Sequence, residues 1–456
     1  MKKLVALLAA ALVAGACSVS TPRHEALAFR RTGPAAIDGE PQSTVEGAAL
    51  GADPFPETAG AAATTIGDGS PTTQATDTAT PATAPPVDKA ASATAVPGVT
   101  KTTVTVSVVA GFSGPLAAMV QRAYDGLLTW QDDVNAANGI NGRKVVLKKV
   151  DHKETADGGV AACKEVQSNN SYFAIVPEGV DATITAVSCL DAAGIPTFYY
   201  SATTNPKWKL AFADIVTSEQ AGAEMASYVA HPLGAAKKKI GVIYVNQASY
   251  AALNNGFTPK AKQLGLDLAS AEAVEANSAS FTAPLLRLKQ AGVQVLIISA
   301  TTDAVGILRD AKSIGFNAQF VGWGFQFDFI TTAGRDLFQG VAALRAYATV
   351  DSAAYNAYAA RMQARGRGRN RTDDLEGFSA YGHALVTGEL IKRAGPNPTR
   401  ASLVAGAETF RAFDNGVVGP LTWSPTDHVG THTTFPTVCC NSDWTWKTAG
   451  APRTEY

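Results

Sequence analysis

From residue 103 onward the chain alternates short β-branched, apolar runs with stretches of helical spacing, and this alternation limits its possible folds more than any other feature. Residues 103–110 (Thr-Val-Thr-Val-Ser-Val-Val-Ala) predict a strand, residues 111–115 break it, and residues 116–137 have the apolar spacing of a helix. Strands that alternate with helices predict βαβ units and mostly parallel sheets. The expected fold class is therefore α/β.

The alternation falls into two series, which predicts two α/β lobes. The first series has expected strands at 103–110, 144–150, 173–176 and 196–200, and expected helices at 116–137, 158–169 and 182–193. After a helix at 219–229, the second series has expected strands at 240–245, 293–299 and 319–322, and expected helices at 253–264, 281–290 and 304–313. Ligands of open α/β sheets bind beyond the carboxyl ends of the strands, so we expect the functional residues in the loops there.

Residues 1–16 have the parts of an export signal. A basic start is followed by an apolar run at residues 4–13 and by small residues up to Ala16. Cys17 comes next, and Val-Ala-Gly-Ala-Cys resembles the lipobox of bacterial lipoproteins, although Ala14 stands where a larger aliphatic residue is more common. We expect lipidation of Cys17 and an extracytoplasmic location, anchored to the cell membrane; an ordinary secreted protein is the alternative.

Residues 17–100 have the composition of a disordered tether. Between residues 51 and 100, 38 of 50 residues are Ala, Thr, Pro, Gly or Ser. Such a segment has too little apolar surface to offset the entropy lost on ordering. We expect a spacer that holds a folded domain away from a membrane, and its Thr and Pro content leaves O-glycosylation open.

The net charge and the length of the apolar runs exclude two classes of protein. Lys and Arg number 38 and Asp and Glu 39, a net charge of −1, so no nucleic-acid partner is expected. After the N-terminal signal no uninterrupted apolar run reaches 18 residues, which excludes a polytopic membrane protein. The arginine-rich run at residues 361–371 is expected to be a solvated helix end and loop.

Motifs of rival functions are incomplete. Residues 111–114 (Gly-Phe-Ser-Gly) are one residue short of a nucleophile elbow, and residues 322–324 (Gly-Trp-Gly) lack the third glycine of a dinucleotide-binding fingerprint. His428 and His432 have metal-like spacing without a ligand cluster beside them. We therefore expect no enzyme activity, no metal and no cofactor.

Several segments carry a family resemblance in their order along the chain. They are residues 108–146 (Val-Val-Ala-Gly-Phe-Ser-Gly-Pro-Leu to Asn-Gly-Arg-Lys-Val-Val), residues 193–206 (Ala-Gly-Ile-Pro to Ser-Ala-Thr-Thr-Asn-Pro), Tyr250, and residues 419–423 (Gly-Pro-Leu-Thr-Trp). Together they resemble the leucine/isoleucine/valine-binding, type I periplasmic solute-binding proteins, which are the substrate-binding components of branched-chain amino acid ABC transporters. The resemblance covers about residue 103 to the end.

The resemblance implies two Rossmann-like lobes joined by three crossovers, near Thr217, Thr349 and Val417, that close around a solute. The implied parts are a signal peptide (1–16), the lipidated Cys17 and tether (17–100), an N-terminal lobe (101–217 plus 350–417) and a C-terminal lobe (218–349 plus 418–456). It further implies a monomer that captures a small-molecule solute and delivers it to an ABC transporter permease. A ligand-sensing receptor component with the same fold is the alternative.

The resemblance and the strand-end loops select the same ligand contacts. Ser201, Ala202 and Thr203 present hydroxyl and backbone N–H groups where the family holds a ligand carboxylate, and Tyr250 is expected to cover the ligand from the second lobe. Further expected contacts are Met119, Asp181, Thr301 and Trp323.

The loop after the expected strand 319–322 departs from the family pattern. Amino-acid binders of the family carry a carboxylate there, which neutralises the α-ammonium of the ligand. Here the loop contains Trp323, Phe325 and Phe327, with no acid before Asp328. Because an unpaired buried ammonium is costly, we expect a carboxylate or amide with an apolar or aromatic body. A branched-chain amino acid, with Asp181 or Asp328 as the ammonium partner, is the alternative.

Four cysteines remain after Cys17 is assigned to lipid. The resemblance implies a disulfide between Cys163 and Cys189, since some relatives carry one in this region, and export favours oxidation. Cys439 and Cys440 lie next to each other in an apparent terminal strand, where successive side chains point to opposite faces, so their state stays open.

Overall fold

The computed structural model describes residues 95–114, 116–178, 181–200, 203–300, 302–323, 334–369, 374–440 and 445–454. The predicted signal peptide, Cys17 and most of the predicted tether lie outside these ranges. Val99 forms an isolated bridge with Val104, and Val96 and Val99 both pack against the core. Contacts with the folded part therefore begin several residues before position 101, because these two valines have apolar surface to bury.

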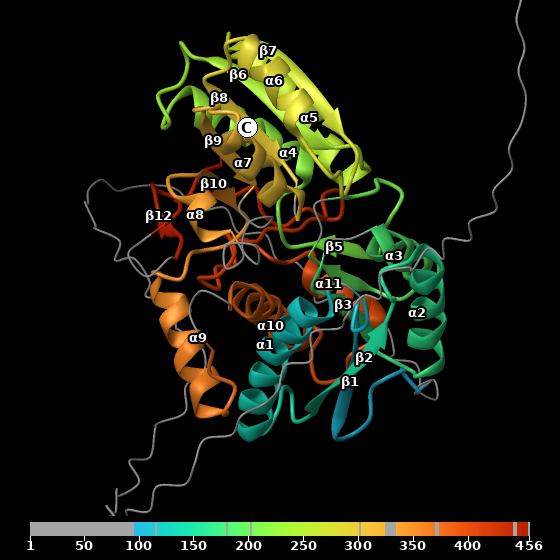
Figure 1. Cartoon of the computed structure of the whole chain (residues 1–456). Helices are drawn as coiled ribbons and strands as arrows, with labels where there is room; N and C mark the ends of the chain where they lie inside the picture. Colours follow the sequence, from blue (N-terminus) through green and yellow to red (C-terminus); the bar gives the residue numbers. More distant parts are fainter. Residues whose placement is uncertain are drawn as a thin grey trace, which may run out of the picture. The chain divides into compact units, whose positions relative to one another are not determined.

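The first sheet contains five parallel strands in the order β2-β1-β3-β4-β5 (Figure 1). Its strands are β1 (Thr103–Ala110), β2 (Lys144–Asp151), β3 (Phe173–Val176), β4 (Thr197–Tyr199) and β5 (Ala211–Ala213), and the intervening helices are α1 (Ala117–Ala136), α2 (Ala156–Ser168) and α3 (Asp181–Ala192). Three of its strands, β3, β4 and β5, are buried along their whole length. Such continuous apolar strands are typical of a parallel sheet that is covered on both faces.

The second sheet contains seven strands in the order β12-β11-β10-β9-β8-β6-β7. Its strands are β6 (Lys239–Val245), β7 (Asp267–Val274), β8 (Val295–Ser299), β9 (Gln319–Trp323), β10 (Ala342–Arg345), β11 (Phe435–Val438) and β12 (Lys447–Thr448); its helices are α4 (Ser218–Ala230), α5 (Ala248–Gln263), α6 (Thr282–Gln290), α7 (Asp303–Ser313) and α8 (Arg335–Phe338). The strands from β6 to β10 pair in parallel, whereas β11 and β12 are antiparallel additions at one edge.

The chain passes between the two series more than once. After β10 it forms α9 (Ala353–Ala364), α10 (Leu375–Arg393) and α11 (Arg400–Ala407), and α10 packs along α1 of the first series (Figure 1). It then returns to the second sheet as β11. The fold is therefore two α/β lobes, as the sequence predicts, while the lobe boundaries given above stay a prediction.

Backbone bridges connect the segments that pass between the lobes, and a helix cap marks where α4 begins. Tyr347 bridges Val418, and Ala213 bridges Val429, so segments far apart in the sequence share backbone hydrogen bonds. Thr217 starts α4 with a capping box, in which its hydroxyl accepts the N–H of Gln220 at 3.1 Å. Such a cap fixes the residue at which a helix begins.

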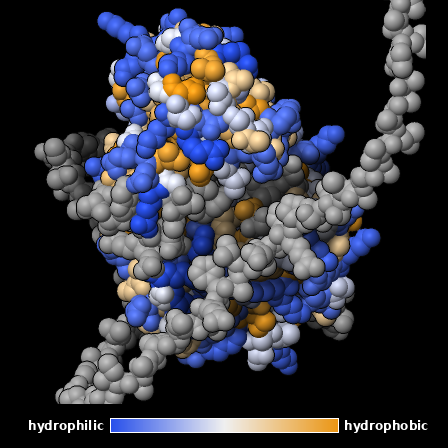
Figure 2. All heavy atoms as spheres, viewed as in Figure 1, coloured by the Kyte–Doolittle hydropathy of each residue, from blue (hydrophilic) through white to orange (hydrophobic). Residues whose placement is uncertain are grey.

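Apolar side chains lie mainly inside the lobes. On the face seen in Figure 2 the described surface is largely hydrophilic, with apolar residues in scattered patches. Among the described residues, the large apolar side chains that are exposed are Val146, Val160 and Leu286. None of the helices in this part of the chain is both long and apolar enough to cross a membrane.

The disulfide implied by the resemblance is present. Cys163 of α2 and Cys189 of α3 are bonded, with their Cα atoms 6.0 Å apart, and Cys163 is fully buried. The bond ties two helices that pack on the same side of the first sheet. Cys439 and Cys440, which the sequence leaves open, are bonded to each other.

Candidate functional site

A narrow crevice lies at the carboxyl end of the first sheet, where functional loops are expected. It is formed by the start of α1, the segment after β3 and the start of α10, and its lining residues are Met119, Val120, Ala123, Pro177, Glu178, Glu376 and Ser379. Its free volume is about 10 Å³, enough for one water-sized group. The predicted contact Met119 therefore lies in the wall of this crevice.

Glu178 follows β3 and is almost completely buried, with 2% of its surface exposed. Its Oε1 accepts the N–H of Gly111 at 2.6 Å and lies 2.6 Å from Nε2 of His152. Nδ1 of His152 accepts the N–H of Glu154 at 3.1 Å. Gly111 and His152 together hold this carboxylate at the end of β3.

Glu376, in the first turn of α10, is the second acid in the crevice wall. It is 4% exposed, and its Oε2 lies 3.5 Å from Nε of Arg122 on α1. Burial raises the pKa of Glu376, and the nearby Arg122 opposes that shift. The fully buried Arg345 of β10 also acts on this carboxylate over a longer distance.

Two further carboxylates hold the loop after β1 in place. Ser113 donates from Oγ to Asp151 at 2.6 Å, and the N–H of Leu116 donates to Glu154 at 2.8 Å. Burial alone would raise the pKa of Asp151, but hydrogen bonds from the Ser113 side chain and nearby backbone N–H groups outweigh it and lower the pKa. Burial raises the pKa of Glu154. These two acids organise the loop that borders the crevice.

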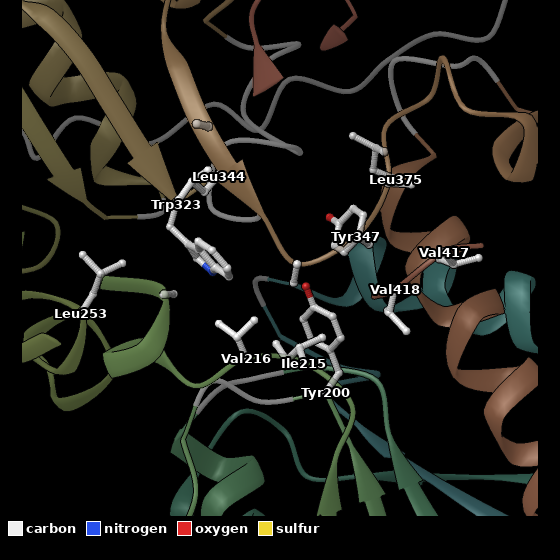
Figure 3. Packing of buried hydrophobic residues seen from close by; sticks show 14 of the residues in the cluster. Tyr200, Ile215, Val216, Leu253, Trp323, Leu344, Tyr347, Leu375, Val417 and Val418 are labelled. Carbon is white, nitrogen blue, oxygen red and sulfur yellow. The ribbon is translucent and has the colours of Figure 1, made fainter. Parts of the chain in front are cut away.

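Aromatic side chains gather where strands of both sheets end. Tyr200 follows β4, Trp323 ends β9 and Tyr347 follows β10, and Figure 3 shows Trp323 directed toward Val216 and Tyr200. The rings of Tyr200 and Tyr347 are 6.2 Å apart, and all three side chains are at most 4% exposed. Burial raises the pKa of both tyrosines, so their hydroxyl groups stay protonated and can donate hydrogen bonds.

A buried acid–histidine pair fixes the first passage between the lobes. Oδ2 of Asp214, just after β5, lies 2.6 Å from Nδ1 of His383 on α10. Both side chains are at most 3% exposed, and the His383 ring meets the edge of Tyr200 at 5.4 Å. The pair thereby links Tyr200 to α10, the helix that also supplies Glu376.

The remaining predicted contacts lie at strand or helix ends. Tyr250 is in the first turn of α5, half-buried, and its carbonyl accepts a hydrogen bond from Ser299. Thr203 is half-buried in the loop after β4, and Asp181 is the first residue of α3. Ser201, Ala202, Thr301 and the loop 324–333 lie outside the described residues. The role of each as a ligand contact stays a prediction.

Glu178 and Glu376 are residues of this crevice that were not predicted from the sequence. A signal for Glu178 is present, since Pro177 and Glu178 directly follow the buried strand β3 at its carboxyl end. Nothing local marks Glu376, because its place in the crevice comes from the packing of α10 against α1.

His428, one of the two histidines with metal-like spacing, packs against an aromatic ring. His428 stacks on Phe212 at 3.8 Å between ring centroids, and burial lowers its pKa. His428 also lines a wide depression of about 710 Å³ beside β5, together with Trp208. Across the described ranges no group of three or more His, Cys, Asp or Glu side chains is placed to hold a metal ion.

The two sheets, the passages between them and the strand-end site define the bilobal class of solute-binding proteins. A family model described as periplasmic binding protein matches residues 103–439, and the chain belongs to this family. Membership implies a location outside the cytoplasm.

One curated relative and two solved structures are similar to this chain. The Leu/Ile/Val-binding protein homolog 3 of Brucella melitensis is 26% identical over 332 residues, covering 71% of this chain and 88% of the relative. A branched chain amino acid ABC transporter structure from Thermus thermophilus, with bound valine, has a TM-score of 0.68 at 15% identity, covering 77% and 97%. A solute-binding protein of an ABC transporter from Rhodopseudomonas palustris, in complex with 3,4-dihydroxy benzoic acid, has a TM-score of 0.65 at 13% identity, covering 78% and 98%.

Proposed function

We propose that this protein captures a small organic solute at the carboxyl ends of its strands and delivers it to the permease of an ABC importer. The proposal is supported by the position of the candidate site in the fold. A crevice, a set of buried aromatic rings and the predicted contacts Met119 and Trp323 all lie where strands end, in a chain of the periplasmic binding protein family.

We further propose that the solute is a carboxylate or amide with an apolar or aromatic body. Tyr200, Trp323 and Tyr347 supply aromatic surface, which selects planar or apolar groups by burial and geometry. The two structural neighbours cited above hold valine and 3,4-dihydroxy benzoic acid, which share a carboxyl group. A branched-chain amino acid is the alternative solute, and the family relatives named for Leu, Ile and Val favour it.

The predicted anchoring belongs to the same proposal. A lipidated Cys17 and a tether up to about residue 100 would hold a monomeric solute-binding domain near the membrane that contains the permease. A receptor component that senses the same solute would share this arrangement. Loss of solute uptake in cells that lack the gene, restored by the wild-type gene, supports import; unchanged uptake with a lost transcriptional response supports sensing.

Substitutions in the predicted carboxylate subsite test the binding site. We predict that Ser201→Ala and Thr203→Ala each weaken solute binding by about 1–3 kcal/mol, because each removes a donor from a desolvated charge. Thermal-shift screening against amino acids and against aromatic and aliphatic acids and amides identifies the solute, and calorimetry then measures its affinity. Ser168→Ala, at an exposed position of α2, is the control. Unchanged affinity in both site variants would place the carboxylate elsewhere.

A further inference from the structure

The walls of the crevice contain two carboxylate oxygens that lack a partner. Among the described residues, Oε2 of Glu178 and Oε1 of Glu376 are buried and have no hydrogen-bond partner, although both residues line the crevice. A buried carboxylate oxygen without a donor is costly, so such atoms in a native protein call for an explanation. A ligand that donates hydrogen bonds here would supply it.

The two charged residues in the lining of the crevice are both acids. The other oxygen of Glu178 accepts the N–H of Gly111 and lies 2.6 Å from Nε2 of His152. Arg122 faces the other oxygen of Glu376 at 3.5 Å, and Arg345 acts on it from β10. No Lys, Arg or His side chain is among the described residues that line the crevice, so a nitrogen donor that enters it meets acceptors and no lining cation.

The size and lining of the crevice limit which hydrogen-bond donor of a ligand can enter it. Room for one water-sized group admits an ammonium or a carboxamide nitrogen but not a guanidinium or a ring. Met119, Val120 and Ala123 form an apolar wall beside the two acids, which suits the carbon body that follows such a nitrogen. A metal ion is not favoured, because no larger cluster of ligating side chains occurs in the ranges that the structure describes.

We propose that Glu178 and Glu376 form a first-lobe subsite that binds an N–H-bearing nitrogen of the solute, either an ammonium or a carboxamide. The subsite rests on the proposed function and narrows its solute class. It takes over the task of the acid that the loop at residues 322–327 lacks. A solute that contains only carboxylate and hydrocarbon does not satisfy these two oxygens.

Small probes that differ in one group test this subsite on the mature full-length protein. Benzamide and acetophenone have nearly the same shape, but only benzamide has N–H groups, and benzylammonium carries the charged alternative. We expect benzamide or benzylammonium to bind at least tenfold more tightly than acetophenone in thermal-shift and calorimetric titrations at millimolar concentration. The stronger of the two identifies a neutral or a charged nitrogen. Equal shifts from all three probes, or no shift from any, overturn the subsite.

Substitutions then assign the effect to the two acids. Glu178→Gln and Glu376→Gln are each expected to weaken the stronger nitrogen probe at least tenfold. Glu165→Gln is the control, because Glu165 is an exposed acid of α2 that does not line the crevice, and it should change affinity less than twofold. Far-ultraviolet circular dichroism checks that each variant is folded.

Different experimental results would overturn the Glu178–Glu376 subsite and the proposed function. If a nitrogen-free acid from the solute panel binds, and both glutamine variants bind it as the wild type does, the subsite is overturned while solute capture stands. If neither probe nor panel solute binds, both are overturned.

Discussion

At the scale of single residues, burial of Asp374 makes stability depend on pH. Asp374 precedes α10, is 2% exposed, and burial raises its pKa to about 7, against the opposing effects of Tyr358 and Arg369. In the unfolded chain its pKa returns to about 4. The folded state therefore holds the proton more tightly, and the stability that this proton contributes is full below pH 4 and is lost as pH rises through about 7.

We predict that Asp374→Asn removes this dependence. The wild type should lose about 2–4 kcal/mol of unfolding free energy at this site between pH 4 and 8, whereas the amide variant should not show that loss. Urea unfolding of both proteins at several pH values measures the difference. Asp157→Asn, at an exposed position of α2, should keep the wild-type pH profile. Parallel profiles for the wild type and Asp374→Asn would contradict the prediction.

The sequence predicts some residues of the candidate site and gives no sign of others, for a physical reason. Met119 was predicted because a family pattern marks its position; it lies in the wall of the crevice, and its role as a ligand contact stays a prediction. Glu178 and Glu376 were missed because charged side chains are expected at the surface unless partners from other segments bury them. Those partners, Gly111 for Glu178 and Arg122 for Glu376, are 67 and 254 residues away in the chain.

At the scale of elements, the Cys163–Cys189 disulfide joins α2 to α3 across 26 residues of chain. Loop-closure entropy predicts that such a bond stabilises the folded state by about 3 kcal/mol. We predict that a Cys163→Ser/Cys189→Ser double variant loses roughly this amount in urea unfolding. Peptide mapping of the wild type without reductant should find neither cysteine as a free thiol; free thiols at both positions would contradict the bond.

Arginines after the middle of α9 pair with the acidic side of α1. The carboxylate of Asp133 forms ion pairs with the guanidinium groups of Arg361, at 3.1 Å, and Arg365, at 2.7 Å. Arg367 pairs with Asp132, and Arg369 pairs with Asp125. Four arginines of the run expected to be solvated thus pair with acids and hold the end of α9 to α1, while Arg371 lies outside the described residues.

We predict a modest loss of unfolding free energy when the ion pairs of Asp133 are removed. Asp133→Asn removes two pairs at once, and because the arginines are about one-third exposed, screening limits the loss to about 0.5–2 kcal/mol. The loss should shrink when thermal unfolding is repeated in 1 M salt. Glu165→Gln, an exposed acid of α2, should have almost no effect at either salt concentration. A loss that is insensitive to salt would show that packing, and not charge, is responsible.

Among the elements, those with β-branched runs were predicted best. Strands β1 and β3 have the predicted bounds, whereas β7 was not predicted at all. Its sequence, Asp-Leu-Ala-Ser-Ala-Glu-Ala-Val, contains one β-branched residue, and it is an edge strand that pairs on one side with β6. Strand β5 was missed because three residues give too little pattern. Pairing with a neighbour, and not local preference, makes both segments strands.

At the scale of the whole molecule, distant parts of the chain complete each lobe. Strands β11 and β12 of the second sheet follow α9, α10 and α11 in the sequence, so one edge of this sheet comes from the end of the chain. The alternation of strands and helices predicts two lobes but not this return. Only the family resemblance supplied the expected crossings, because they depend on contacts between segments that no local pattern connects.

The end of the described chain is attached to the start of the second series. Arg453 exchanges two backbone hydrogen bonds with Thr434, both at 2.8 Å, and its guanidinium lies 2.7 Å from Oε1 of Glu224 on α4. The Arg453 side chain is 12% exposed and that of Glu224 is 1% exposed. The attachment is therefore a largely buried ion pair between residues 229 positions apart.

We predict that Arg453→Met destabilises the protein by about 3–5 kcal/mol, because it removes the guanidinium from a carboxylate that stays buried. Adding Glu224→Gln should recover most of that loss, since it removes the charge that the first change leaves without this cation. Urea unfolding of the wild type, both single variants and the double variant gives the coupling energy. A double variant whose loss equals the sum of the single losses would show that the two groups act independently. The C-terminal segment would then contribute to the second lobe through its strand pairing alone.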